Sequence, residues 1–295
     1  TPFRFGLSNG ENLEGDYTAP DHSSTNCREN QYGSSAAKHT ISRLRLCLPR
    51  CKNGVRKKKW LFGDIRMLAL SRAKVREVDA VAMEEYYLPG IVLMENAGRN
   101  ASEAIVRLFD SISEQDIVVV VGPGNNGGDG LVIARYLELA GAKVRVVLAA
   151  PPQRFRGDSL TNLEIINRSG IHQVCLAGAV AEQWQNALSS ATCVIDAILG
   201  TGATGAARGD SKVAIESILG RMEIDRRPCV ISIDVPSGFD CDRGVPCGSC
   251  VCANETLTFV ASKTGFMTID AKLYTGRIQI IDIGVPQVVL NRFGL

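Results

Sequence analysis

A run of five consecutive β-branched residues, 117–121, constrains the fold of this chain more than any other feature. Such a short, wholly apolar run predicts a strand buried on both faces, as strands are in parallel sheets covered by helices. A glycine-rich stretch of nine residues follows it, and a helical pattern follows at 131–139. The alternation continues, with strands predicted at 144–148, 172–176, 193–198 and 229–234, helices at 160–167, 181–188 and 212–219, and further strands at one edge at 257–260 and 278–283.

Strands that alternate with helices of this length imply right-handed βαβ crossovers and a mostly parallel sheet. We therefore predict an α/β fold, a three-layer αβα Rossmann-like sandwich. Two amphipathic helices are predicted before the first strand, because apolar residues recur at helical spacing around 75–86 and 97–108. No internal repeat or shift in composition follows residue 65, so one domain is predicted over 65–295.

The N-terminal part of the chain has a different character. Residues 1–60 contain 11 Lys and Arg against 5 Asp and Glu, although the formal net charge of the whole chain is only +2. Because this part shows no sustained hydrophobic period, we predict a basic, disordered segment over 1–64. Its basic cluster at 56–59 is either a contact for nucleic acid or anionic lipid, or a solvated tail. We expect the second, and nucleic acid is not an expected partner.

The sequence also bears on location. No apolar run approaches the ~18 residues of a membrane span. The N-terminus lacks the layout of a secretory signal, and acidic residues at positions 11, 14, 16 and 21 argue against a transit peptide. We therefore expect no membrane association and a cytoplasmic location.

The ten cysteines are spread through the chain, and reduced thiols fit a cytoplasmic protein better than disulfides do. Four of them follow the spacing C-x5-C-x2-C-x-C, which contains one pair of the kind that zinc sites use but no second pair and no nearby histidine. We predict a loop with incidental thiols, with a structural zinc site as the alternative. The four residues are Cys241, Cys247, Cys250 and Cys252.

In open parallel sheets, ligands bind beyond the carboxyl ends of the strands. The stretch GPGNNGGDG at 122–130 lies at such an end, and Gly122, Gly124 and Gly127 satisfy G-x-G-x-x-G. This context favours a phosphate or pyrophosphate bound by backbone amides at a helix N-terminus. No acidic residue follows the second strand, and no Lys-Ser/Thr follows the glycines. Neither an ordinary NAD dehydrogenase nor a Walker A site is therefore supported.

Two later loops also follow predicted strands. In the glycine-rich stretch 196–205, Asp196 either ligates a cation or caps the turn. In the stretch 234–240, Asp234 ends a buried strand, where a low dielectric can raise its pKa and suit it to general acid–base catalysis; the alternative is a hydrogen-bonded turn residue. The three loops together offer oxygen ligands suited to an alkali or alkaline-earth cation, namely Asn126, Asp196 and Ser237.

These loops, in this order and preceded by LMENAGR at 93–99, resemble the NAD(P)H-hydrate epimerase family, also called the YjeF N-terminal domain family. The resemblance runs from about Val75 to Pro286 and includes VREVD at 75–79, DVPSG at 234–238 and KTG at 263–265. It implies an isomerase that interconverts the R and S hydrates of NADH and NADPH. These are damaged cofactors that carry a hydroxyl at C6 of the reduced nicotinamide ring.

The resemblance also implies where ligands bind. The substrate would lie against Asp234 and the segments matching 125–129 and 200–206, and one potassium ion per subunit would occupy the oxygen ligand set above. The implied substrate-binding residues are Asn125, Asn126, Gly127, Gly128, Asp129, Gly200, Thr201, Gly202, Ala203, Thr204, Gly205, Ala206 and Asp234, and the implied potassium ligands are Asn126, Asp196 and Ser237. From the chemistry of the hydrate, we hypothesise that Asp234 is the general acid–base.

Partners follow from the same resemblance. Members of the family often continue into an ATP- or ADP-dependent dehydratase domain, and because this chain stops at Leu295 we expect a separate dehydratase in the same pathway. A homodimer is also implied. The stretch 241–252 and Asn254 depart from the family pattern. The main alternative is a non-catalytic nucleotide-binding or protein-interaction scaffold of the same fold, and the third is an NAD-dependent dehydrogenase.

Overall fold

The computed structural model describes residues 68–224 and 227–295. The predicted basic segment 1–64, with its cluster at 56–59, lies outside the described residues, and the division into a segment and a domain stays a prediction. Within the described ranges, no helix is both long enough and apolar enough to cross a membrane.

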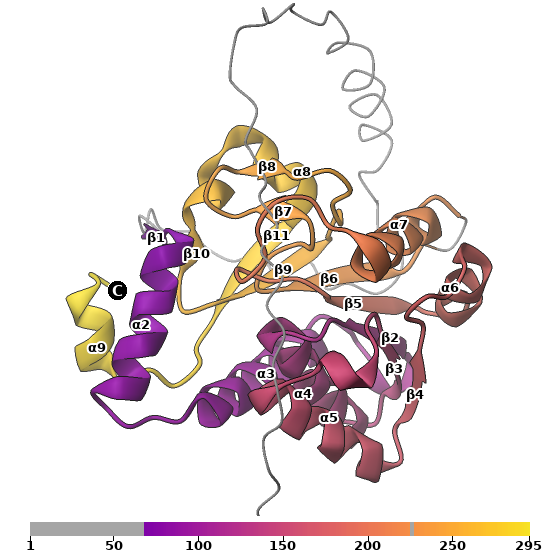
Figure 1. The fold of residues 1–295 in the computed structure, drawn as a ribbon, viewed down its shortest axis with the longest axis horizontal. Coiled ribbons are helices and arrows are strands. Elements are labelled where there is room, and N and C mark those ends of the chain that lie inside the picture. Colours follow the sequence, from indigo (N-terminus) through magenta and orange to yellow (C-terminus); the bar gives the residue numbers. More distant parts are fainter. Residues whose placement is uncertain (1–67, 225–226) are drawn as a thin grey trace, which may run out of the picture. The chain divides into compact units, whose positions relative to one another are not determined.

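Seven strands form the central sheet, in the order β11-β9-β6-β5-β2-β3-β4 (Figure 1). Every pair of neighbours in this sheet is parallel, which confirms the predicted α/β fold. The β-branched run forms β2, which lies inside the sheet between β5 and β3 and is buried, as its composition predicts. The strands are β2 (Asp116–Val121), β3 (Lys143–Leu148), β4 (His172–Cys175), β5 (Cys193–Ala197), β6 (Cys229–Ile233), β9 (Glu255–Phe259) and β11 (Arg277–Ile281).

The direction in which the chain crosses the sheet determines where a ligand can bind. From β2 the chain passes outward through β3 to β4, and then returns to the other side of β2 at β5. The connections that leave β2 and β5 therefore diverge, and a crevice forms between the carboxyl ends of these two strands. The described part of the chain has its topological switch point there.

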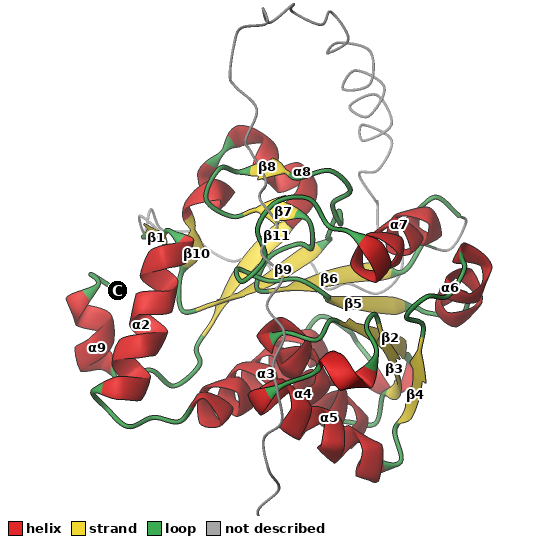
Figure 2. Cartoon of the chain, in the orientation of Figure 1, coloured by secondary structure: helices red, strands yellow, loops and turns green. Residues whose placement is uncertain are grey.

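Helices cover both faces of the sheet (Figure 2). Helices α3, α4 and α5 pack side by side on one face, whereas α6 and α7 pack together on the other. Right-handed crossovers require this division, because the chain moves in opposite directions on the two sides of β2. The helices are α2 (Arg72–Glu84), α3 (Gly90–Val106), α4 (Asn125–Leu139), α5 (Gly157–Ser169), α6 (Ala181–Leu188), α7 (Gly209–Met222), α8 (Lys272–Thr275) and α9 (Gln287–Arg292).

The boundary of α4 corrects one prediction. The stretch 122–130 is not a loop throughout, because α4 begins at Asn125 and includes three of the five glycines. Each glycine in the helix lies where a side chain would collide with a neighbour: a Cβ on Gly128 would lie 2.6 Å from Met94 Sδ, and one on Gly130 would lie 2.5 Å from Ala197 Cβ. Glycine costs about 1 kcal/mol per residue in a helix interior, and close packing offsets this cost.

Several short elements were not predicted from the sequence. Strand β1 (Ala69–Leu70) pairs in parallel with β10 (Ser262–Lys263), and β7 (Phe239–Asp240) pairs in antiparallel fashion with β8 (Val245–Pro246). The first pairing anchors Lys263 beside the carboxyl ends of the main strands. The 3₁₀ helices are η1 (Ile112–Glu114), η2 (Pro152–Arg154), η3 (Thr264–Met267) and η4 (Ile269–Ala271).

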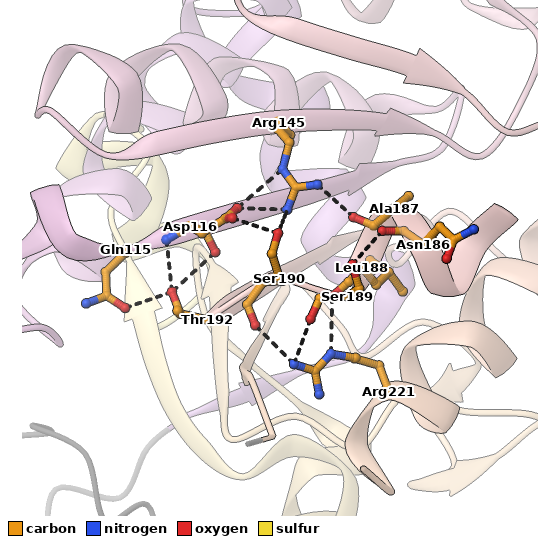
Figure 3. Close-up of polar contacts among 11 residues, drawn as sticks. Gln115, Asp116, Arg145, Asn186, Ala187, Leu188, Ser189, Ser190, Thr192 and Arg221 are labelled. Carbon is orange, nitrogen blue, oxygen red and sulfur yellow. Dashed lines mark hydrogen bonds and ion pairs between the residues drawn. The ribbon is translucent and has the colours of Figure 1, made fainter. Parts of the chain in front are cut away.

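Near the amino ends of β2 and β3, two arginines bind the end of α6 (Figure 3). Arg145 donates to Ala187 O at 3.0 Å and forms an ion pair with Asp116 at 2.8 Å. Arg221 donates to Leu188 O at 3.2 Å. The last carbonyls of a helix have no hydrogen-bond donors within the helix, and here the two guanidinium groups donate to them. This network is therefore structural and lies at the edge opposite the switch point.

Candidate functional site

A cavity of about 580 Å³ opens at the switch point. Its size falls in the range of pockets that bind small molecules or cofactors. Residues of α2, α3 and the first turns of α4 line it, together with the segments after β2, β5 and β6. The charged side chains among its lining residues are Arg76, Asp79, Asp129, Asp158 and Asp234. Carboxylates thus predominate on a wall that is otherwise largely apolar.

Asp234 forms an ion pair with a buried lysine. Lys263 Nζ lies 3.0 Å from Asp234 Oδ1, and the backbone N–H of Thr201 donates to Oδ2 at 2.9 Å. The ammonium group also donates to Thr258 Oγ1 at 2.8 Å and Phe259 O at 2.9 Å. Asp234 itself has a positive φ of 63°, which is unusual for a residue with a side chain.

These contacts correct the predicted direction of the Asp234 pKa. Burial alone would raise the pKa of Asp234, but the charge of Lys263 and the hydrogen bonds from Thr201 and Lys263 lower it below its ordinary value. The carboxyl group is therefore ionised at neutral pH. A carboxylate in this state accepts protons, so the geometry favours a base rather than an acid at this position.

Asp196 lies at the centre of a second group of contacts. It is fully buried, and Ser237 donates to it twice, from Oγ to Oδ1 at 2.5 Å and from the backbone N–H to Oδ2 at 2.9 Å. Ser232 Oγ donates to Oδ2 at 2.8 Å. Burial raises the pKa of Asp196 in spite of these hydrogen bonds. Asp196 thus joins β5 to β6 and to the loop that follows β6.

The third predicted cation ligand lies nearby. Asn126 is only 8% exposed, and neither atom of its side-chain amide has a hydrogen-bond partner among the described residues. Its side chain lies against Gly200, and Ser237 Oγ accepts from the backbone N–H of Leu199 at 2.9 Å. The structure therefore brings Asp196 into contact with Ser237 and places Asn126 against the same loop. A buried amide oxygen without a partner fits a cation or a polar ligand.

The cysteine cluster gives no support to the zinc alternative. Cys241, Cys250 and Cys252 are buried, and all the described cysteines are free thiols. Within residues 68–224 and 227–295, no group of three or more His, Cys, Asp or Glu side chains could hold a metal ion. Cys241 Sγ instead accepts a hydrogen bond from Arg72 at 3.7 Å.

Two further carboxyl groups line the cavity. Asp129, on α4, is 9% exposed, and burial together with the negative charges of Asp234 and Asp79 raises its pKa well above the ordinary value. Burial and the charge of Asp234 raise the pKa of Asp79, on α2, to about 6, although Lys263 opposes this shift. Three carboxyl groups therefore share one ammonium group, and repulsion favours a proton on one of them.

The predicted substrate-binding residues divide into two groups. Most of them line the cavity: Asn125, Asn126, Asp129, Gly200, Thr201, Gly202, Ala203 and Asp234. Gly127 and Gly128 are buried inside α4. Thr204, Gly205 and Ala206 continue the loop beyond the cavity lining in the described structure. Helix α4 begins at Asn125, and the amides of a first helical turn have no partners within the helix, so anion binding there stays a prediction.

Helix α2 holds the loop that follows β5. Arg72 Nη1 donates to Ala203 O at 2.7 Å, and Arg76 Nη2 lies 3.4 Å from Thr201 O and Gly202 O. Arg76 also lines the cavity, and among the described residues that line it no other is a lysine or an arginine. The guanidinium group is thus available to a phosphate group in the cavity.

Sequence reasoning assigned no role to Asp79 or Lys263, although both lie in segments that carried the resemblance. A signal existed for Asp79, because it follows the buried residues Val75 and Val78 on the inner face of an amphipathic helix. A charged residue at such a position indicates a cavity or a buried partner. No comparable signal existed for Lys263, whose partner is distant in the sequence.

Comparisons with known proteins show the family to which this chain is similar. The family described as "YjeF-related protein N-terminus" matches residues 90–265. An NAD(P)H-hydrate epimerase from Pirellula staleyi is 40% identical over 221 residues, which cover 75% of this chain and 94% of the relative. A second NAD(P)H-hydrate epimerase, from Rhodopirellula baltica, is 37% identical over 222 residues and is covered to 86%.

The chain also matches part of longer relatives. A bifunctional NAD(P)H-hydrate repair enzyme Nnr from Moorella thermoacetica is 40% identical over 223 residues, but the match covers only 41% of its length. Among solved structures, yeast ynu0 aligns with a TM-score of 0.64 at 23% identity, covering 78% of this chain and 94% of the yeast protein. This last likeness supports the fold alone.

Proposed function

Because this chain belongs to the family of YjeF-related protein N-termini, we propose that it catalyses the interconversion of the R and S hydrates of NADH and NADPH. One observation carries the proposal beyond the family: a single cavity at the switch point contains both the free N-terminus of α4 and an ionised, buried Asp234. The first suits the pyrophosphate of a dinucleotide, and the second suits proton transfer. The protein is accordingly an isomerase.

The chemistry of the substrate requires such a group. C6 of the hydrate bears both a hydroxyl and the ring nitrogen, so it is a carbinolamine carbon. It can lose the hydroxyl to give an iminium ion, or open to an aldehyde, and then re-form from the opposite face. Both routes need proton transfer at oxygen or nitrogen. Asp234, held ionised by Lys263, accepts the proton of the incoming nucleophile.

Charge determines how the dinucleotide lies in the cavity. The amides at the start of α4 and the guanidinium group of Arg76 are the positive features of the lining, and they bind the pyrophosphate. The acidic side chains Asp79, Asp129 and Asp234 leave the remaining end of the cavity for the neutral nicotinamide ring and its developing positive charge. The substrate is thereby oriented with C6 toward Asp234.

Potassium belongs to the same proposal. Asn126, Asp196 and Ser237 would hold one ion per subunit, and the unpartnered amide oxygen of Asn126 fits a ligand for such an ion. When bound, the ion would add positive charge near the phosphates. We expect activity in potassium buffer to exceed activity in a tetramethylammonium buffer of equal ionic strength. Equal rates in the two buffers would contradict the potassium site.

The proposed partners follow from the longer relatives. Their name describes a bifunctional NAD(P)H-hydrate repair enzyme, so a second repair activity accompanies the matched part in those proteins. We propose a separate ATP- or ADP-dependent dehydratase as the corresponding partner of this chain, and a homodimer as its assembly. A cytoplasmic location stays a prediction.

The deciding experiment incubates the purified protein with the resolved R hydrate of NADPH in potassium buffer and follows formation of the S form. We expect equilibration much faster than the spontaneous rate. Asp234→Asn should lower the rate 10²–10⁴-fold, the usual contribution of a general acid–base. Asp270→Asn, at an exposed aspartate that does not line the cavity, is the matched control and should keep full activity. A folded wild-type protein without acceleration would favour the scaffold alternative.

A further inference from the structure

We propose that Asp129 is the acid partner of Asp234, a protonated carboxyl group that donates its proton to the departing C6 hydroxyl. The inference rests on the proposed epimerase function and assigns a second catalytic residue to the same cavity. The two groups belong to different elements, since Asp129 lies in α4 and Asp234 follows β6. On the iminium route, C6 first releases and then accepts oxygen, so one group that donates a proton and one that accepts a proton are chemically sufficient.

The surroundings of the two carboxyl groups differ in the way that this division of labour requires. Asp234 has an ammonium group at 3.0 Å and a backbone N–H at 2.9 Å, both of which stabilise its charge. Asp129 is 9% exposed, and the influences on its charge in the described structure are burial and the negative charges of Asp234 and Asp79, with no cation among them. A buried carboxyl group without a cation is more stable in its neutral form, which carries a proton for donation.

The charged groups around Asp129 strengthen this preference. Asp79 of α2 and Asp234 both face it, and their negative charges add to burial in raising the pKa of Asp129 well above the ordinary value. Lys263 of β10 interacts with Asp234 and Asp79 rather than with Asp129 directly. Arg76 lines the same cavity. Burial and these two negative charges therefore favour the neutral, protonated form of Asp129.

The proposed step balances as follows for the R to S direction. The C6–O bond breaks, its electron pair stays with oxygen, and the oxygen takes the proton of Asp129 and leaves as water. The ring nitrogen supplies its lone pair, giving an iminium ion that the anions Asp79 and Asp234 stabilise. Water then adds to the opposite face of C6 and loses its proton to Asp234. The S to R direction passes through the same states in reverse, so it starts from the less populated form with Asp234 protonated and Asp129 ionised. Proton exchange with solvent between turnovers connects this form to the resting one.

The first test is the Asp129→Asn variant, which keeps the shape of the side chain but has no acidic proton. We expect kcat to fall 10²–10⁴-fold in both directions with KM changed less than threefold. The variant should unfold at the same temperature as the wild type or a higher one, because it removes a buried ionisable group. Epimerisation within tenfold of the wild-type rate would overturn the assignment.

Two measurements that do not use the Asp129→Asn variant keep the proposal testable if that variant fails to fold. Wild-type turnover in ¹⁸O-labelled water should place one labelled oxygen at C6 per conversion, because the C6–O bond breaks; retention of the original oxygen would overturn the step. In addition, Asp79→Asn removes a negative charge that raises the pKa of Asp129. The alkaline limb of the kcat/KM profile should therefore shift to lower pH. An unmoved limb would contradict Asp129 as the acid.

The experiments distinguish a failure of the proposed epimerase function from a failure of the proposed role of Asp129. If the wild-type protein does not accelerate epimerisation at all, the proposed function fails and Asp129 has no reaction to serve. If the wild type is active while the labelling or the Asp129→Asn result is negative, the epimerase proposal stands and only the role of Asp129 is refuted.

Discussion

Replacing Lys263 with methionine is the most direct test of how the cavity holds its charges. The side chain is fully buried, and its ammonium group lies 3.0 Å from Asp234 Oδ1. The methionine fills the same space but leaves a buried carboxylate without its cation. Removing one partner of a buried ion pair lowers the free energy of unfolding by about 3–5 kcal/mol. We expect Lys263→Met to lower the free energy of unfolding by about this amount at pH 7.5.

The size of this loss should depend on pH in a defined direction. In the wild type, Lys263 holds the pKa of Asp234 below its ordinary value. Without the lysine, burial raises that pKa, and the carboxyl group can take up a proton in mild acid. The destabilisation should therefore be smaller at pH 5 than at pH 7.5. Urea unfolding followed by far-UV circular dichroism at the two pH values measures the difference.

A double-mutant cycle separates the ion pair from the other contacts of Lys263. Adding Asp234→Asn to Lys263→Met removes the unpaired charge, so the double variant should be more stable than the sum of the single effects by about 2–3 kcal/mol. Lys272→Met, at an exposed lysine, is the control and should change stability by less than about 0.5 kcal/mol. A loss below about 1 kcal/mol for Lys263→Met, or additive single effects, would refute the reasoning.

Three further predictions follow from the described contacts. Gly127→Ala should abolish activity and destabilise the fold, because its Cβ would overlap a backbone carbonyl, whereas Gly124→Ala, whose Cβ meets nothing within 4 Å, should unfold at the wild-type temperature. Asp79→Asn should raise the free energy of unfolding by about 3 kcal/mol well above pH 6 and have little effect near pH 4, because the pKa of Asp79 is raised from 3.8 to about 6; a constant effect across pH would contradict this. Arg76→Gln should raise KM for the NADPH hydrate about tenfold with little change in kcat, while Lys74→Gln on the same helix should change neither.

The architecture was predictable because its signals are local. A strand buried on both faces needs apolar residues throughout, and an amphipathic helix needs them every three to four residues, so each pattern is visible within a short window. The pattern at 117–121 thus identified the buried strand β2, and its neighbours followed from the same alternation. The position of Asp234 after a strand also placed it at the carboxyl edge of a parallel sheet.

The start of α4 was missed for a reason that is also physical. Glycine weakens a helix in isolation, so the run at 122–130 favoured a loop. In the folded chain, Met94 and Ala197 approach the helix so closely that only glycine fits at Gly128 and Gly130. Packing between elements that are distant in the sequence overrides the local preference, and no window of sequence contains that information.

The sequence by itself determined the order of the main elements, the edge of the sheet at which a ligand is expected and the oxygen-bearing side chains that lie near it. Only the tertiary structure decided the charge state of those groups. Asp79, Asp129, Asp234 and Lys263 come from four separate parts of the chain and meet around one cavity. A pKa depends on burial and on neighbouring charges in space. The direction of each shift, lowered for Asp234 and raised for Asp129, therefore emerges only when the chain has folded.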